Sequence, residues 1–153
     1  MGVPDYIEDL KAWREEFEYF YPVTVRFSET DAFGHLNNTT AFVYFEHGRI
    51  SFFKQIGLMQ DWTKKEIEAI PVTADLHCDY VKQVYFDEEL QIGLKLNRVG
   101  RSSMDIHYMA VNGSGEICFT GRGAIVQVSS KTGQSIPWTI EEKERLESRM
   151  PRR

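Results

Sequence analysis

Hydrophobic and polar residues follow two different periods in the first part of the chain. Between Pro4 and Phe17 the apolar side chains have helical spacing, at Ile7, Leu10, Trp13 and Phe17. Residues 21–28 instead alternate, which predicts a half-buried strand with one face formed by Val23, Val25 and Phe27. Helical spacing then returns from about Asn38 to Ile56, at Phe42, Phe45, Phe52, Phe53 and Ile56. Gly57 is typical of a residue that ends a helix.

The remainder of the chain is mostly strand-like. Four segments have the composition and alternation of strands, namely 72–86, 89–98, 102–111 and 116–128. The run Asn-Gly-Ser-Gly at 112–115 is a hairpin turn sequence between the last two of them. Four consecutive strands joined by short connections predict an antiparallel sheet.

Two Thr-x-x-Glu spacings predict further short helices, because this pattern forms a capping box at a helix start. One helix is predicted from Thr63 to about Ala69. The other is charged and is predicted from Thr139 to about Pro151.

The order of these elements indicates the fold class. One early strand, one long helix and four consecutive strands predict an α+β fold, with a curved five-stranded antiparallel sheet wrapped around a central helix. The length of 153 residues is suited to a single domain, 1–153. Within it we expect an N-terminal helix in residues 1–19 and a C-terminal helix and tail in 139–153.

Composition narrows the possible functions. The formal net charge of −5 argues against a nucleic-acid-binding protein, which needs a concentrated basic surface. No window approaches the ~18 apolar residues of a membrane span, and the first residues lack the basic start and apolar core of a signal peptide. A cytoplasmic protein is therefore expected. Cys78 and Cys118 are too few for a disulfide framework and lack metal-ligand spacing, so we expect free thiols and no metal site.

Candidate chemistry is concentrated in residues 26–49, which read RFSETDAFGHLNNTTAFVYFEHGR. Asp31 and His35 lie just ahead of Asn37 and Asn38, at the predicted entrance of the long helix. A helix N-terminus carries unpaired N–H groups and partial positive charge, which stabilise a developing oxyanion. A carboxylate one loop away could attack an acyl carbonyl or activate water for the attack. The pattern therefore predicts acyl transfer or hydrolysis.

A structural interpretation of the same residues is also open. Asp-x-x-Gly is preferred in a type I turn, so Asp31 and Gly34 could serve the backbone alone. Asn37 or Asn38 could be an ordinary N-cap, and His35 a hydrogen-bonded loop residue. Spacing alone does not decide between the two interpretations.

The segment resembles a known signature. Asp-x-x-Gly-His-x-Asn-Asn, followed by Tyr-Phe-Glu-x-x-Arg, is similar to the motif of hotdog-fold acyl-CoA thioesterases of the 4-hydroxybenzoyl-CoA thioesterase type, which include the Tol–Pal-associated enzymes. The matching residues are Asp31, Gly34, His35, Asn37, Asn38, Tyr44, Phe45, Glu46 and Arg49. The order of elements agrees from about residue 20 to 128. The resemblance implies the hotdog fold and hydrolysis of an acyl-CoA thioester to a carboxylic acid and CoA, without a cofactor.

The resemblance also implies roles for the loop residues. Asp31 is expected to be the catalytic carboxylate, as nucleophile or as base for water. The backbone N–H of Asn38 is the expected oxyanion donor. His35 would orient the thioester or relay a proton, with a structural role as the alternative. Gly34 and Phe33 are expected to contact the substrate, Phe33 by lining the acyl channel.

Three positions near the long helix have more open roles. Asn37 is expected to shape the loop at the substrate. Ala41 stands where many relatives carry an aromatic residue, which would leave more room in the acyl pocket. Glu46 is a second candidate carboxylate, because another branch of hotdog thioesterases uses one on this helix. However, its i, i+3 spacing to Arg49 predicts a local ion pair.

CoA carries phosphates, so an acidic protein must supply local positive charge. The predicted turn at 98–103 offers Arg98, Arg101 and Ser102 as phosphate ligands, although solvated turn arginines are an equal interpretation. Arg122 and Lys82 are weaker candidates.

Assembly and competing functions complete the predictions. A five-stranded sheet with one covering helix leaves an exposed edge, so we expect a homodimer or a dimer of dimers with composite sites. The resemblance implies the same. The main alternative is a non-catalytic acyl-CoA-binding module, and a second is a hotdog dehydratase or hydratase.

Overall fold

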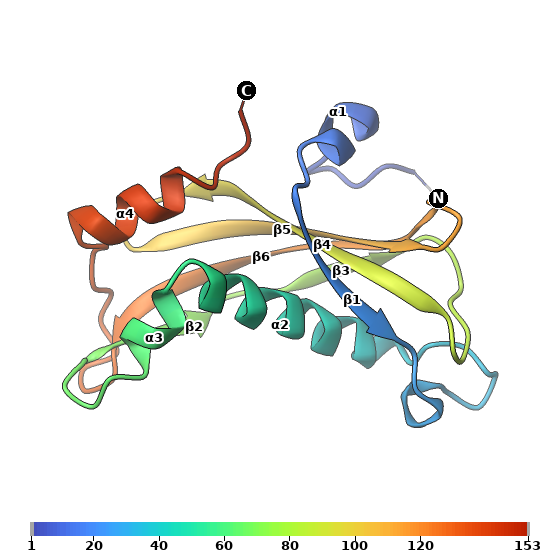
Figure 1. Ribbon diagram of the computed structural model, residues 1–153, viewed down its shortest axis with the longest axis horizontal. Helices are drawn as coiled ribbons and strands as arrows, with labels where there is room; N and C mark the ends of the chain where they lie inside the picture. The colour runs from blue at the N-terminus through green and yellow to red at the C-terminus, as the bar shows by residue number, and fades with distance from the viewer. Residues whose placement is uncertain (1, 153) are drawn as a thin grey trace.

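One long helix lies against a curved antiparallel sheet in the computed structural model, which describes residues 2–152 (Figure 1). The elements in chain order are α1 Leu10–Glu15, β1 Tyr19–Thr24, the 3-10 turn η1 Phe27–Glu29, α2 Asn38–Gln55, α3 Leu58–Trp62, β2 Ala69–Thr73, β3 His77–Tyr80, β4 Glu89–Val99, β5 Ser103–Asn112, β6 Ile117–Ser129 and α4 Ile140–Glu147. The predicted α+β class and hotdog architecture are confirmed.

The sheet has five strand positions, in the order β1-β4-β5-β6-β2, and β3 also pairs with β6. The single strand predicted over 72–86 is therefore wrong, because β2 and β3 share one position. Asp75 causes the interruption. Its carboxylate oxygen Oδ1, in place of a strand carbonyl, accepts the Ala124 N–H at 2.8 Å. The two short strands then pair with successive parts of β6.

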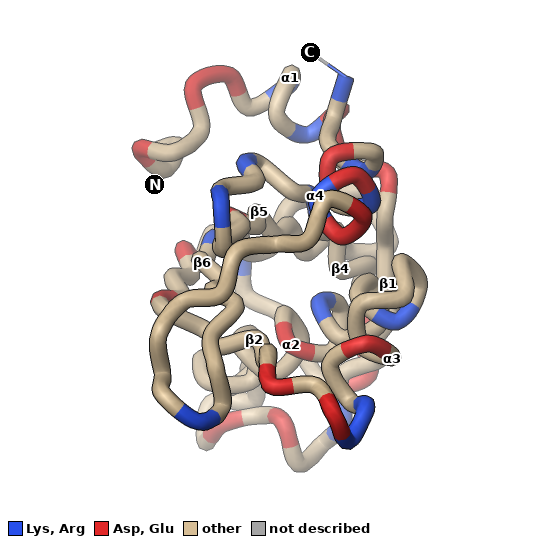
Figure 2. The backbone as a smooth tube through the Cα atoms, turned by 90° about the vertical axis from the view of Figure 1, so that its left-hand side faces the viewer, with Lys and Arg blue, Asp and Glu red and all other residues tan. Residues whose placement is uncertain are grey.

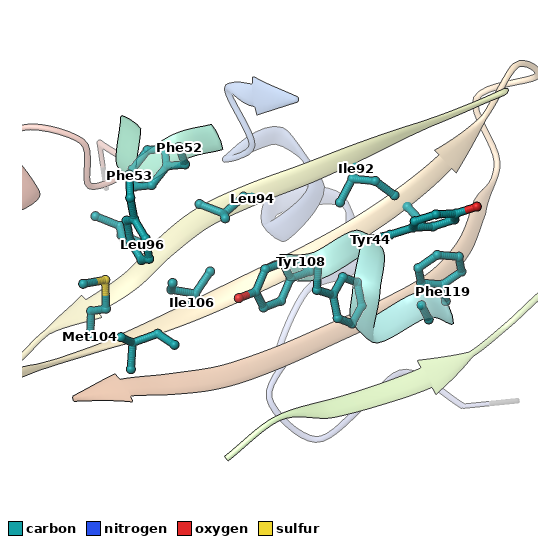
Figure 3. Packing of buried hydrophobic residues seen from close by; sticks show 14 of the residues in the cluster. Tyr44, Phe52, Phe53, Ile92, Leu94, Leu96, Met104, Ile106, Tyr108 and Phe119 are labelled. Carbon is teal, nitrogen blue, oxygen red and sulfur yellow. The ribbon is translucent and has the colours of Figure 1, made fainter. Parts of the chain in front are cut away.

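The core lies between α2 and the inner face of the sheet (Figure 3). The rings of Phe45 and Tyr108 stack with their centroids 4.4 Å apart. Gly48 lies where α2 packs on β4, and a Cβ there would be in ordinary van der Waals contact with a side-chain methyl of Ile92, at 3.4 Å. The predicted long helix is confirmed, and it ends next to Gly57, which has a φ of 83°.

The central strand β5 is covered on both faces. Ile106, Tyr108 and Ala110 face α2 as part of the main core. Met109 lies on the opposite face of the strand, where it packs with Trp13 and Phe17 of the N-terminal segment. Figure 1 shows α1 and α2 on opposite sides of the sheet. The helix predicted from Pro4 to Phe17 is shortened to α1, because Asp9 caps its start by accepting the Ala12 N–H.

The helix predicted from Thr63 to Ala69 is wrong. The helix α3 instead ends at Trp62, and Thr63 is its C-cap residue. The Thr63 hydroxyl donates to the Met59 carbonyl at 2.8 Å, so it closes the preceding turn instead of opening the next one. In contrast, the capping box at Thr139 is confirmed, although α4 ends at Glu147, before the predicted Pro151.

The early strand is shorter than predicted as well. It ends at Thr24, and the chain turns into η1 at Phe27, whose side chain is exposed.

Acidic and basic residues are interspersed along α4 and around α3 (Figure 2). None of the helices described in residues 2–152 is long and apolar enough to cross a membrane.

Candidate active site

The loop between η1 and α2 is organised around Asp31. One carboxylate oxygen, Oδ1, accepts the backbone N–H groups of Phe33 at 2.9 Å and His35 at 3.2 Å. Gly34 donates its N–H to the Asp31 carbonyl and has a φ of 79°, a conformation that favours glycine. The other oxygen, Oδ2, makes no hydrogen bond within residues 2–152. Asp31 therefore fixes its own loop with one oxygen and leaves the second available.

The helix α2 begins directly after the Asp31 loop. Asn37 is the N-cap of α2, and its side-chain oxygen accepts the Thr39 N–H at 3.0 Å. The N–H of Asn38 makes no hydrogen bond among the described residues 2–152. The Tyr80 hydroxyl donates to the Asn38 carbonyl. A helix start with an unpaired N–H is suited to binding a negatively charged oxygen.

A cavity of about 320 Å³ opens at this helix start. Asp31, His35 and Asn38 line it together, which brings the three predicted catalytic residues to one place. The rest of the lining comes from Leu36, Tyr80, Val81, Lys82, Gln83, Val84 and Phe119. A mostly apolar cavity lined by a carboxylate residue and by the first residue of a helix can hold an acyl group beside a base or nucleophile and near an oxyanion donor.

The segment after β3 fixes the loop from the other side. Leu36 donates its N–H to the Val84 carbonyl at 2.7 Å, and His35 forms an isolated bridge with Tyr85. The rings of His35 and Tyr85 meet edge to face, with centroids 5.2 Å apart. The histidine ring is thus placed by packing at the cavity wall.

Glu29 joins the loop to the helix. Its oxygen Oε1 accepts hydrogen bonds from the Tyr44 hydroxyl and the Arg26 N–H, both at 2.9 Å. Its carbonyl accepts the Asn37 N–H at 2.8 Å. Burial alone would raise the pKa of the Glu29 carboxyl, but these hydrogen bonds outweigh it and the pKa is lowered. Burial and the nearby Glu29 carboxylate raise the pKa of Tyr44, so its hydroxyl remains the donor.

Five predicted substrate contacts near the loop and α2 do not line this cavity, namely Gly34, Asn37, Ala41, Phe33 and Glu46. Gly34 and Asn37 instead hold the backbone of the loop and the start of α2. Ala41 is fully buried in the core and does not line the cavity. Phe33 is on the loop but its side chain is 81% exposed. Glu46 lies on the solvent side of α2, 3.9 Å from Arg49, beside a separate hollow next to Tyr21. The predicted ion pair of Glu46 is confirmed.

The β4–β5 turn with Arg98, Arg101 and Ser102 lies at the far end of the sheet. Phe119 marks the cavity end of β6, and Val126 pairs with β5 at the turn. At ~3.3 Å per residue, the stretch of β6 between them is about 23 Å long. Within one chain these residues and Asp31 are therefore far apart. Arg122 is held by Asp105 at 2.7 Å, whereas Lys82 lines the cavity.

The comparison with known families agrees with the geometry. Residues 25–146 match the model of the thioesterase-like superfamily, which covers the loop, α2 and the sheet. The chain belongs to the thioesterase-like superfamily. Membership supports thioester hydrolysis as the general activity.

Several proteins are similar to this chain over nearly the full length. YsmA of Bacillus subtilis (strain 168) is 46% identical over 147 residues, which are 95% of this chain and 97% of YsmA. A predicted thioesterase from Bacillus stearothermophilus is 30% identical, with a TM-score of 0.77 over 88% of this chain and 98% of that one. A thioesterase from Thermus thermophilus, solved with coenzyme A and zinc, is 27% identical, with a TM-score of 0.74 over 88% and 95%.

Part of this candidate site was not predicted from the sequence. The opposite cavity wall at residues 80–84 was assigned to the interior of a long strand. Glu29 and Tyr44 were not given supporting roles. The Tyr44 position within the motif was the one available signal, whereas nothing in the sequence indicates that residues 80–84 face Asp31.

Proposed function

We propose that this chain hydrolyses an acyl-CoA thioester to a free carboxylic acid and CoA. The observation that carries the proposal is the shared cavity, which is lined both by Asp31 and by Asn38 at the start of α2. A carboxylate and an unpaired helix N–H are the two parts that thioester hydrolysis requires. The thiolate leaving group departs without an acid.

In the proposed reaction the Asp31 carboxylate either attacks the thioester carbonyl carbon or takes a proton from the attacking water. The carbonyl oxygen gains negative charge and accepts a hydrogen bond from the Asn38 N–H. The C–S bond then breaks and CoA leaves as a thiolate. If Asp31 is the nucleophile, water subsequently cleaves the mixed anhydride. His35 would orient the thioester from the cavity wall.

The CoA part of the substrate is supported by the resemblance of the motif and by the Thermus thermophilus relative that contains coenzyme A. In a single chain, Lys82 is the basic residue at the cavity. The distant Arg98, Arg101 and Ser102 could reach a CoA only from a second subunit. We therefore propose a homodimer, or a dimer of dimers, in which each site receives the β4–β5 turn of the partner.

A thiol-release assay over aliphatic and aromatic acyl-CoA thioesters tests this function. We expect CoA release with at least one acyl class. Tight acyl-CoA binding without release would instead support the non-catalytic binding module. Hydration of an enoyl-CoA in the same panel would support the dehydratase alternative.

A further inference from the structure

The Asp31 loop is a small closed hairpin whose base lies at the start of α2. Thr30 and Leu36 form a bridge, and within it the Asp31 N–H donates to the His35 carbonyl at 2.8 Å. The base is closed where Asn37 donates its N–H to the Glu29 carbonyl. These hydrogen bonds hold the hairpin together internally, in addition to its contacts with residues 84 and 85.

One side-chain contact ties this hairpin base to the body of α2. The Glu29 carboxylate accepts the Tyr44 hydroxyl at 2.9 Å, and the Glu29 side chain is only 11% exposed. Tyr44 is itself buried in the core, so its hydroxyl has a fixed position. The same carboxylate oxygen accepts the Arg26 N–H at the entry of the hairpin. Glu29 thus connects both ends of the hairpin to the second turn of the helix.

We propose that the Glu29–Tyr44 contact is a positioning device that sets Asp31 relative to the Asn38 N–H. This inference rests on the proposed hydrolysis. Asp31 belongs to the hairpin and the Asn38 N–H belongs to the helix, so their separation depends on how hairpin and helix are joined. A displacement of about 1 Å between reacting groups can reduce a rate by about a hundredfold. Neither Glu29 nor Tyr44 lines the cavity, so both act through Asp31.

Tyr44→Phe tests the contact because it removes one hydroxyl and keeps the buried ring. We expect kcat to fall at least about tenfold, with KM within about twofold, since the substrate contacts remain. Tyr19→Phe is the matched control. Its hydroxyl bonds Ser51, which lies toward the other end of the same helix, and its loss should leave kcat unchanged.

Two Glu29 variants separate positioning from stability. The side-chain oxygen of Glu29→Gln can still accept both hydrogen bonds, so this variant should keep kcat within about threefold. The kcat of Glu29→Ala should fall by about as much as the kcat of Tyr44→Phe. Equal losses in both Glu29 variants would overturn the positioning role.

Hydrogen exchange of the loop amides provides a measurement that does not depend on turnover. The N–H groups of Phe33, His35 and Asn37 should exchange faster in Tyr44→Phe than in the wild type or in Tyr19→Phe. Unchanged exchange together with an unchanged kcat would refute the proposal. If the wild type released no thiol from any acyl-CoA, the proposed function would fail, while faster exchange would still demonstrate the positioning contact.

Discussion

At the scale of single residues, the two oxygens of Asp31 have separate tasks. One oxygen accepts two N–H groups of its own loop, and the other makes no hydrogen bond within residues 2–152. An asparagine can reproduce the first task, because its carbonyl oxygen accepts the same two bonds. It cannot act as nucleophile or base.

We therefore expect Asp31→Asn to abolish turnover while the fold and acyl-CoA binding persist. Steady-state kinetics and a thermal unfolding curve check both parts. A residual rate above about a tenth, which is a barrier change under ~1.4 kcal/mol, would show that Asp31 is not the catalytic group. Glu46→Gln is the matched control, since the Glu46 side chain is 62% exposed and does not line the cavity. This variant should keep the wild-type kcat and most of the free energy of unfolding.

Sequence reasoning was most successful for residues close together in the chain. Asp31, His35 and Asn38 lie within one turn and one helix cap, so local geometry brings them together. The opposite wall could not be predicted in the same way. Tyr80 reaches Asn38 only because β3 pairs with β6 in one particular register. That register depends on packing between distant segments.

At the scale of elements, the long helix α2 and the last three strands were predicted correctly, whereas most errors concern shorter elements. The length of α2 and of β4 gives an unambiguous period, whereas a single side chain decides each short element. Asp75 interrupts the strand predicted at 72–86, and Thr63 closes α3 instead of opening a helix. Such side-chain hydrogen bonds compete with backbone pairing, and the hydrophobic pattern does not reveal them.

Element packing also leads to a pH prediction at the contact of α3 with α4. Arg145 donates to Asp61 at 2.7 Å, and this hydrogen bond lowers the pKa of the Asp61 carboxyl. A carboxyl whose pKa is lower in the folded than in the unfolded chain adds stability above its unfolded pKa of about 3.9, and this stability is lost as pH falls through the folded value.

Asp61→Asn should therefore reduce the free energy of unfolding by about 1 kcal/mol at pH 7, and the difference from wild type should shrink below about pH 4. Denaturant unfolding at both pH values measures it. Glu147→Gln is the control, because the Lys143–Glu147 pair is 4.0 Å apart and mostly exposed. A constant difference between Asp61→Asn and wild type at all pH values would contradict the ion-pair explanation.

At the scale of the whole molecule, the predicted homodimer accounts for surfaces that one chain leaves open. The strands β2 and β3 form an edge of the sheet. The exposed aromatic side chains of Phe27 and Phe86 contact each other, with ring centroids 5.8 Å apart. Pairing two chains would cover both the strand edge and the apolar surface.

Sedimentation at micromolar concentration should accordingly show a dimer or a larger even assembly. Arg101→Ala mixed with inactive Asp31→Asn chains provides a second measurement. If each site uses Asp31 of one subunit and the turn of the other, the rate of CoA release by the mixture should differ from the sum of the rates of the two separate variants. A stable monomer with full hydrolytic activity would contradict the composite site.

The N-terminal segment packs on the outer face of the sheet, and this affects where the chain can be truncated. The family match begins at residue 25, yet Trp13 and Phe17 lie upstream of it and are buried against β5. The Trp13 indole also donates to Nδ1 of the buried His107 at 2.9 Å. The packed unit is thus longer than the segment that the family model matches. A protein truncated to the family boundary would keep every proposed catalytic residue. It would lose the side chains that cover the outer face of its sheet.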